Sequence, residues 1–310
     1  MMTKRVPQFR VLTGICGLLL LGCASQIGGA RNPPPTQEGT FPEASIQSVG
    51  GVTLGEPIAV TLDFDGNPLV ANGIPGRVVH LAISRDEAIE FQPPPSPGFY
   101  PTDLQPTGFF VYVIDQVERR LLRFYRTGAY LDVLIDFEDI FQGRRVSPVG
   151  LDVDGSGRIA VTDVKNHAVI IFNTYLDVEL VLGSFGKFAG QFDAPEGVFF
   201  TPGNGLLVAD SGNRRIQLFD AEGGFVKIVP EVSAPNPLRR PRRAVMDRSQ
   251  KIYVADPLAG RVFVFDPSGQ LIRSIVPRGV EEFRPTDLAI APSGLMYVTD
   301  SANNTLYLFR

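Results

Sequence analysis

The chain has 310 residues, a formal charge of −4, 44% hydrophobic residues, 32 glycines and 26 prolines. This length and composition fit one large all-β domain with a leader, and the acidic balance argues against a nucleic-acid partner. The two cysteines, Cys16 and Cys23, both lie near the N-terminus, so we expect no disulfide in the domain.

The first 22 residues are expected to be a signal peptide. Basic residues up to Arg10 precede an apolar run, Val11 to Leu21, that is too short for a membrane span. The run ends in Leu-Leu-Gly-Cys, which resembles the bacterial lipoprotein signal, in which the cysteine receives diacylglycerol before cleavage. The resemblance implies lipidation of Cys23 and removal of residues 1–22, which takes the formal charge from −4 to −7. The alternative is an ordinary signal peptide with a chance cysteine.

Residues 23–43 are predicted to be a flexible membrane tether. The segment contains Gly28-Gly29 and Pro33-Pro34-Pro35 and shows no apolar periodicity. About twenty such residues reach roughly 25 Å in root-mean-square distance, which would hold the domain close to its membrane. Ala24 stands where inner-membrane lipoproteins carry aspartate, so the resemblance implies the outer membrane, on its periplasmic or surface side.

A pattern of about 46 residues then occurs six times between Glu56 and Arg310. Each copy opens with a proline, reaches an aspartate or asparagine about fifteen residues later, and has a leucine or phenylalanine nine residues beyond that. The opening prolines are Pro57, Pro101, Pro148, Pro195, Pro241 and Pro285. A repeat of this length indicates stacked supersecondary units.

Each copy alternates short β-like runs with turn residues, as in residues 197–200, 206–210, 215–220 and 225–229. Four strands at this period are typical of a propeller blade. The last copy ends at Arg310 after its third strand, and Ala44 to Val49 resembles the fourth strands. We therefore predict an all-β, six-bladed β-propeller over residues 44–310, with four-stranded blades and an N-terminal strand that closes the last blade.

The turn that follows the second strand carries a recurring Asp-x-x-Asn motif. It occurs in residues 163–169, 210–216 and 300–306. In the first of these, the asparagine is followed by a histidine, as Asn166-His167. The motif resembles that of the NHL-repeat family, which implies six-bladed propellers. The family includes binding modules, scaffolds and a few enzymes, so the fold alone does not give the function.

The aspartates of these turns are best explained as structural. They recur in nearly every copy as Asp115, Asp163, Asp210, Asp256 and Asp300, with Asn72 in the first. Each can accept hydrogen bonds from the backbone of its own turn. The only histidines are His80 and His167, whereas propeller lyases with zinc use several histidines near the axis, so we expect no zinc.

The repeat is broken at the second residue after each opening proline, where the chain should pass the channel mouth. The six positions hold Ala59, Asp103, Gly150, Gly197, Arg243 and Asp287. Small residues let strands crowd at an axis, so the three charged residues are unexpected. One interpretation is a structural ion-pair network, with Arg243 against Asp287. The other is a polar-ligand or divalent-metal site at Asp103 and Asp287.

Two further breaks are candidate binding features. Arg239, Arg240 and Arg242 flank Pro241 in an otherwise acidic chain, and they would either bind an anion or pair locally. The loop 92–100 is proline-rich and ends in Phe99-Tyr100, which we expect to be exposed anchors. Tyr100 could instead pack beneath the second blade.

We therefore expect a membrane-tethered, non-catalytic binding or scaffold propeller of the bacterial cell envelope, with a protein or glycan partner. The alternative is a metal-assisted enzyme resembling lactonases or lyases, in which Asp103 and Asp287 would hold a divalent cation.

Replacing Cys23 with serine should release the protein from the membrane fraction. Acyl-chain burial contributes about 0.8 kcal/mol per methylene, and the variant would lose all of it. Fractionation and labelling with a radioactive fatty acid measure the change. A parent protein without label, and a variant that still sediments with membranes, would refute the lipid anchor.

Overall fold

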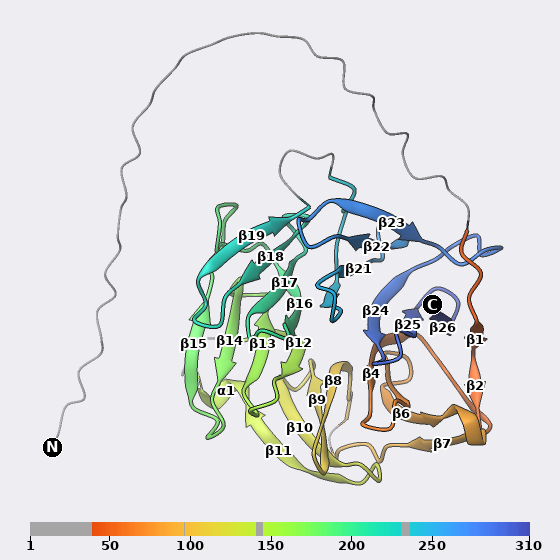
Figure 1. Ribbon diagram of the computed structural model, residues 1–310. Coiled ribbons are helices and arrows are strands. Elements are labelled where there is room, and N and C mark those ends of the chain that lie inside the picture. Colours follow the sequence, from red (N-terminus) through yellow and green to blue (C-terminus); the bar gives the residue numbers. More distant parts are fainter. Residues whose placement is uncertain (1–38, 96, 141–144, 231–235) are drawn as a thin grey trace, which may run out of the picture. The chain divides into compact units, whose positions relative to one another are not determined.

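A computed structural model describes residues 39–95, 97–140, 145–230 and 236–310. Within these residues, six four-stranded antiparallel sheets form a ring of blades (Figure 1). The expected six-bladed β-propeller is confirmed. No helix in the described residues is long and apolar enough to cross a membrane. The signal peptide, Cys23 and most of the expected tether lie outside the described residues.

The first five blades follow one another along the chain, each running from its innermost to its outermost strand. Blade 1 comprises β4 (Pro57–Leu62), β5 (Pro68–Asn72), β6 (Arg77–Ala82) and β7 (Glu87–Glu90). Blade 2 comprises β8 (Pro101–Thr107), β9 (Phe110–Asp115), β10 (Arg120–Tyr125) and β11 (Tyr130–Asp136). Blade 3 comprises β12 (Pro148–Val153), β13 (Ile159–Asp163), β14 (Ala168–Phe172) and β15 (Val178–Leu182).

Blade 4 comprises β16 (Pro195–Phe200), β17 (Leu206–Asp210), β18 (Arg215–Phe219) and β19 (Phe225–Val229). Blade 5 comprises β20 (Arg243–Met246), β21 (Ile252–Asp256), β22 (Arg261–Phe265) and β23 (Leu271–Ile275). Blade 6 comprises β24 (Pro285–Ile290), β25 (Met296–Asp300), β26 (Thr305–Phe309) and, from the N-terminal part, β1 (Ala44–Ile46). Short elements outside the blades are β2 (Ser48–Val49), β3 (Val52–Thr53), η1 (Ile83–Arg85) and α1 (Phe137–Ile140).

The opening proline of most blades pairs with the aspartate or asparagine that ends the second strand, as in Pro195 with Asp210. A register shift follows this pair in every blade whose inner strand begins at the proline. The two ends of the ring are therefore distinct. We call the end with the Asp-x-x-Asn turns the turn face, and the end where first and second strands are joined the hairpin face.

The hydrophobic core is divided among the six junctions between neighbouring blades. One cluster packs Ile58 and Leu69 of blade 1 against Leu104 and Phe124 of blade 2, and each other junction has its own cluster. Alternating side chains of a central strand point to both sheet faces, and both faces are covered by neighbours. Each blade therefore depends on two others.

The N-terminal strand closes the ring. β1 is antiparallel to β26, with Ala44 opposite Leu308 and Ile46 opposite Leu306 (Figure 1). The closing strand is shorter than predicted, because Ser48–Val49 turns away to pair with β3. Thr40, expected in the tether, forms a β-bridge with Pro277, which follows β23 of blade 5. Contacts with the ring therefore begin before residue 44.

Deleting residues 39–46 should lower the melting temperature markedly and promote aggregation. The deletion exposes the edge of β26 and removes Ile46, which is 9% exposed, from the cluster between blades 6 and 1. Thermal melts and light scattering measure the effect. Deleting residues 24–38 is the matched control. A parental melting temperature in the 39–46 deletion would contradict the closing role.

Candidate functional site

The turn aspartates are structural, as expected. Each accepts a backbone N–H from the loop that leads into its own blade, and Asn72 does the same in blade 1. The donors are Gly55, Tyr100, Ser147, Asp193, Arg239 and Arg284, for Asn72, Asp115, Asp163, Asp210, Asp256 and Asp300 in that order. These bonds fix the inter-blade loops on the turn face.

Neither histidine lies at the axis. His80 is on β6, where its Nε2 is 2.9 Å from Asp63 Oδ2 on the hairpin face. The backbone N–H of Ala194 donates to Nδ1 of His167, which lies in the turn after β13.

The channel is crowded at the second residue after the opening proline of each blade. A Cβ atom on Gly150 would lie 2.2 Å from the carbonyl oxygen of Glu196, and one on Gly197 would lie 2.4 Å from that of Arg242. Glycine is therefore required at these two positions. The charged residues of the other blades fill the space that remains.

Arg243 lies between the two carboxylates that the sequence predicted. Its Nη1 donates to Asp103 Oδ2 at 3.0 Å, and its Nε is 3.5 Å from Asp287 Oδ1. Nη1 also donates to the carbonyl oxygen of Val198 at 3.0 Å. All three charged side chains are buried, and Arg243 contacts both carboxylates across the axis.

Each carboxylate also accepts N–H groups from the next blade. Asp103 Oδ2 accepts from Leu151 N–H at 2.8 Å, and Asp287 Oδ2 accepts from Val60 N–H at 2.9 Å. Asp152 does the same two residues further along its inner strand, where its Oδ2 accepts from Phe200 N–H at 2.6 Å. The channel therefore holds three buried carboxylates and one guanidinium.

Asp152 was missed in the sequence. It lies at the fourth position after the opening proline, where the other blades hold Thr61, Gln105, Phe199, Val245 and Ala289. Burial raises the pKa of Asp152 to about 7 and that of Asp287 to about 7, against the opposing charge of Arg243. Burial also raises the pKa of Asp103. Comparing the fourth positions of the repeats would have revealed this acid.

The geometry favours an ion-pair network over a metal site at Asp103 and Asp287. Arg243 lies within ion-pair distance of both carboxylates, and their oxygens accept backbone N–H groups. In the described part of the chain, no three His, Cys, Asp or Glu side chains are grouped as metal ligands.

The arginines beside Pro241 occupy three different environments. Arg239 and Arg240 are exposed, and the backbone N–H of each donates to Asp256. The Arg240 side chain pairs with Glu196 at 2.9 Å, and Arg242 lies 3.8 Å from the same carboxylate. Arg240 keeps 61% side-chain exposure in this pair, so it remains available to a partner.

The expectation that Phe99 is an exposed anchor is wrong. Phe99 is 8% exposed, and its ring packs 6.3 Å from that of Phe124 at the junction of blades 1 and 2. Tyr100 is partly buried against the same cluster. The end of this loop is buried because both rings remove apolar surface from water by packing against this junction.

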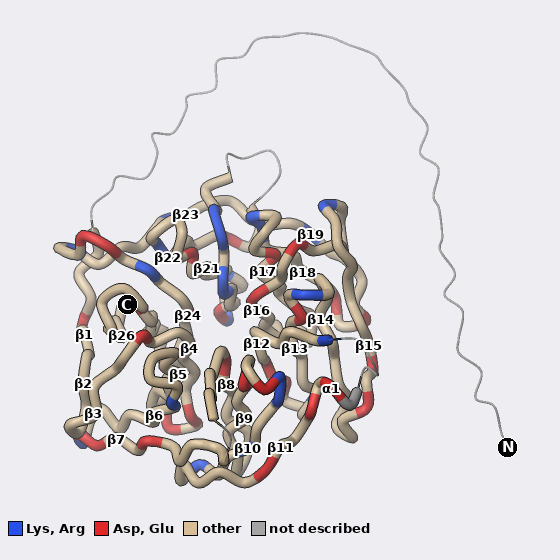
Figure 2. Tube along the Cα trace, turned by 180° about the vertical axis from the view of Figure 1, so that it is seen from behind, with Lys and Arg blue, Asp and Glu red and all other residues tan. Residues whose placement is uncertain are grey.

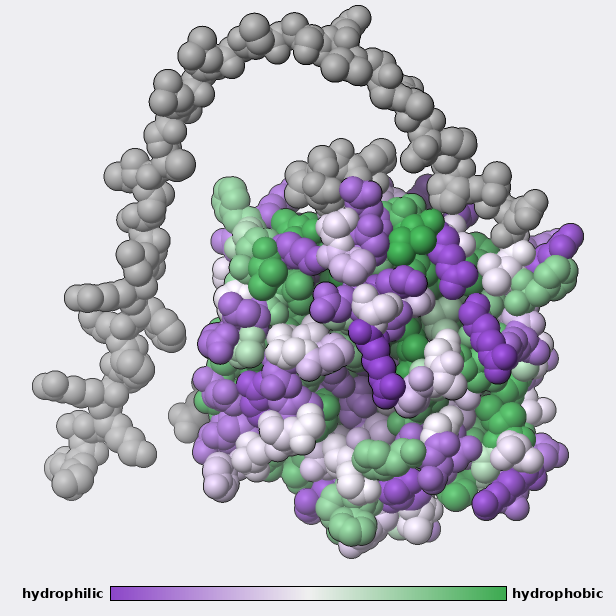
Figure 3. Space-filling model, in the orientation of Figure 1, coloured by the Kyte–Doolittle hydropathy of each residue, from purple (hydrophilic) through white to green (hydrophobic). Residues whose placement is uncertain are grey.

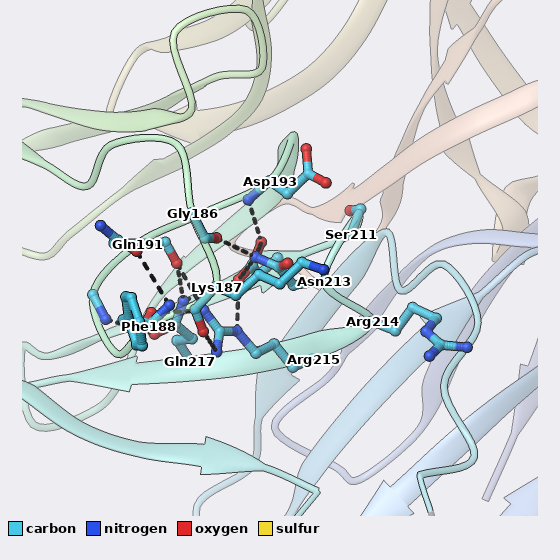
Figure 4. A network of polar contacts seen from close by, with 12 residues as sticks. Gly186, Lys187, Phe188, Gln191, Asp193, Ser211, Asn213, Arg214, Arg215 and Gln217 are labelled. Atoms are coloured by element: carbon cyan, nitrogen blue, oxygen red, sulfur yellow. Dashed lines mark hydrogen bonds and ion pairs between the residues drawn. The ribbon is translucent and has the colours of Figure 1, made fainter.

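Exposed aromatic rings occur instead on the loop 183–193, which the sequence did not single out. Phe185 is 68% exposed and Phe188 is 80% exposed. Arg215 fixes the backbone of this loop by two hydrogen bonds: its Nη1 donates to Lys187 O at 2.7 Å and its Nη2 to Phe188 O at 2.9 Å (Figure 4). Asp210 accepts a 2.7 Å hydrogen bond from Arg215 Nε and orients the guanidinium.

Hydrogen bonds link this loop to two further segments that carry exposed arginines. Gly212 N–H donates to Asp193 O at 2.8 Å, and Asn236 Nδ2 donates to Arg214 O at 2.8 Å, so three turn-face segments are tied together. Exposed residues of these segments form what we call the aromatic-basic patch. Its members are Phe185, Lys187, Phe188, Arg214, Arg239 and Arg240.

Comparison with known proteins supports the repeat assignment. Residues 146–172, from just before β12 to the end of β14, match the family model described as NHL repeat. The chain is 28% identical over 209 residues to the human E3 ubiquitin-protein ligase NHLRC1, covering 62% of this chain and 51% of that protein. It is 26% identical over 135 residues to Protein brain tumor of Drosophila melanogaster, covering 43% and 13%. The chain thus spans about half or less of these relatives.

Solved propeller structures have the same fold. A streptogramin B lyase superposes with a TM-score of 0.64 at 12% identity, covering 86% of this chain and 87% of that one. A catalytically inactive histidine-to-alanine variant of virginiamycin B lyase from Staphylococcus aureus, solved with quinupristin, gives a TM-score of 0.61 at 12% identity, covering 82% and 80%. At this identity the likeness shows the fold alone.

Replacing Arg243 with methionine should destabilise the domain by about 3 kcal/mol at pH 8, because the carboxylates lose their counter-charge. Asp152 and Asp287 keep protons up to about pH 7 when folded but only to about 3.8 when unfolded, so their contribution to stability falls as pH rises between these values. The deficit of the variant should therefore be smaller at pH 5.

Urea unfolding at pH 5 and pH 8 measures this difference. Arg248→Met is the control, since Arg248 is exposed and no ion pair of the described residues includes it. Equal stability of Arg243→Met and the parent at pH 8 would contradict the buried network.

Proposed function

We propose that this protein is a lipid-anchored, non-catalytic propeller of the bacterial cell envelope that binds a protein or glycan partner through its turn face. The observation that carries the binding role is the aromatic-basic patch. Rigid, exposed aromatic side chains are frequent binding hot spots, and flanking cations favour acidic partners.

The rest of the surface supports recognition by a local patch. Acidic and basic residues are interspersed around the ring (Figure 2), and one face shows separate hydrophobic groups among hydrophilic residues (Figure 3). A patch that is already ordered before binding loses little conformational entropy when a partner docks. The hydrogen bonds that Arg215 donates to the loop, and the one that Asp210 accepts from Asp193 N–H, provide this order.

A lipid anchor at Cys23 fits this role, because a tethered domain searches for its partner at high local concentration. The proposed anchor places the protein at the outer membrane, facing the periplasm or the surface. The likeness to lyases motivates a second candidate, a metal-assisted enzyme. The Arg243 network counts against it, because a guanidinium lies between the carboxylates that would bind the metal.

Replacing Phe188 with serine should weaken partner capture about tenfold or more, because one of the two exposed rings of the patch is removed. The protein would be immobilised and exposed to detergent-solubilised envelopes, and bound proteins and glycans quantified by mass spectrometry.

Phe109→Ser is the matched control. Phe109 is 83% exposed, but it lies in the turn between β8 and β9 on the hairpin face. Equal capture by both variants and the parent would exclude the patch, and hydrolysis or elimination that depends on an added divalent metal would favour the enzyme.

A further inference from the structure

The hairpin-face end of the channel contains a chamber of about 220 Å³. All six inner strands contribute to its lining, and it lies on the side of Arg243 away from the turn face. The chamber is small beside the 300–1,000 Å³ pockets that hold drug-sized ligands, so its occupant would be a small molecule.

The lining is polar on one side and apolar on the other. The fourth positions of blades 1, 2 and 3 are Thr61, Gln105 and Asp152, and Thr61 Oγ1 donates to Gln105 Oε1 at 3.1 Å. The fourth positions of blades 4, 5 and 6 are Phe199, Val245 and Ala289. A ligand with one polar end and one hydrocarbon end would match this division.

The charged residues of the chamber determine which charge the polar group of a ligand should carry. Asp152 and Arg243 are the charged residues that line it. Arg243 already pairs with Asp287 of the neighbouring blade 6 and with Asp103 of blade 2 across the axis. Asp152 is 6% exposed and has no ion-pair partner within the described residues. Three carboxylates share one guanidinium, so a cation is missing rather than an anion.

One buried donor atom of Arg243, Nε, has no hydrogen-bond acceptor in the described structure. The hydrogen bonds that the guanidinium donates within the described structure come from Nη1, whereas the buried Nε lies 3.5 Å from Asp287 Oδ1 without hydrogen-bond geometry. Arg243 is 5% exposed, so this buried donor calls for a water molecule as its acceptor.

We propose that this chamber binds a small primary ammonium compound with a compact hydrocarbon body. The ammonium group donates to Asp152 and Gln105, and the hydrocarbon part packs against Phe199, Val245 and Ala289. This site is independent of the partner surface on the turn face.

Ligand-observed NMR and thermal shift on the purified protein test the proposal with three probes of similar size that share an isobutyl group: isopentylammonium, isopentanol and isovalerate. We expect saturable binding of isopentylammonium alone at pH 8. Binding should weaken at least tenfold at pH 5, because Asp152 with a pKa of about 7 is then protonated and neutral.

Two variants separate binding from folding. Asp152→Asn keeps the size of the side chain and should lose the ammonium compound, whereas Asp266→Asn removes the same charge from a surface turn and should not. Ala289→Leu should also block binding, since it fills the apolar half without changing charge. Both chamber variants should melt cooperatively.

Preferential binding of isovalerate, binding of all three probes alike, or binding that Asp152→Asn retains would overturn the proposal. Saturable binding of Mg²⁺, Ca²⁺ or Zn²⁺ that displaces the ammonium compound would also overturn it in favour of a metal. None of these results bears on partner capture by Phe188→Ser.

Discussion

The structure depends on apolar packing between neighbouring blades. Every core cluster joins two blades, so no blade buries its own faces and the ring must close to leave none exposed. This constraint explains why the chain pairs β1 with β26, although the two strands lie at opposite ends of the described sequence. It also explains the turn aspartates, which hold each inter-blade loop so that successive blades keep one orientation.

Closure brings the inner strands together and thereby determines the chemistry of the axis. Two blades require glycine at the second position, and the space left beside them accommodates Arg243 with Asp103 and Asp287. Their carboxylates replace lost water with N–H groups of the next blade and with the guanidinium. Because solvation is only partly replaced, burial raises the pKa of these acids. The same network thus serves stability and creates an unbalanced charge.

Local and periodic features of the fold could be predicted from the sequence. Strand alternation and turn residues act over a few positions. The repeat places equivalent residues on equivalent strands, which was enough to predict the contact between Arg243 and Asp287. Side-chain exposure could not be predicted in the same way. Phe99 is buried because the adjoining blade supplies Phe124 as a neighbour, and Phe188 is exposed because Arg215 bonds to its backbone and leaves its ring outside. Both outcomes depend on contacts between different repeats.

The Arg243 layer also separates the two ends of the channel. On the turn-face side, the space lined by Asp103, Gly150 and Arg243 is only about 10 Å³, which is at the lower limit for a single water. The chamber on the hairpin face is about twenty times larger. We therefore expect a small molecule to enter the chamber from the hairpin face, and a partner docked on the turn face would leave this entrance open. The ring can in this way carry a recognition surface and a separate small-molecule site at opposite ends, with the buried ion-pair network as the wall between them.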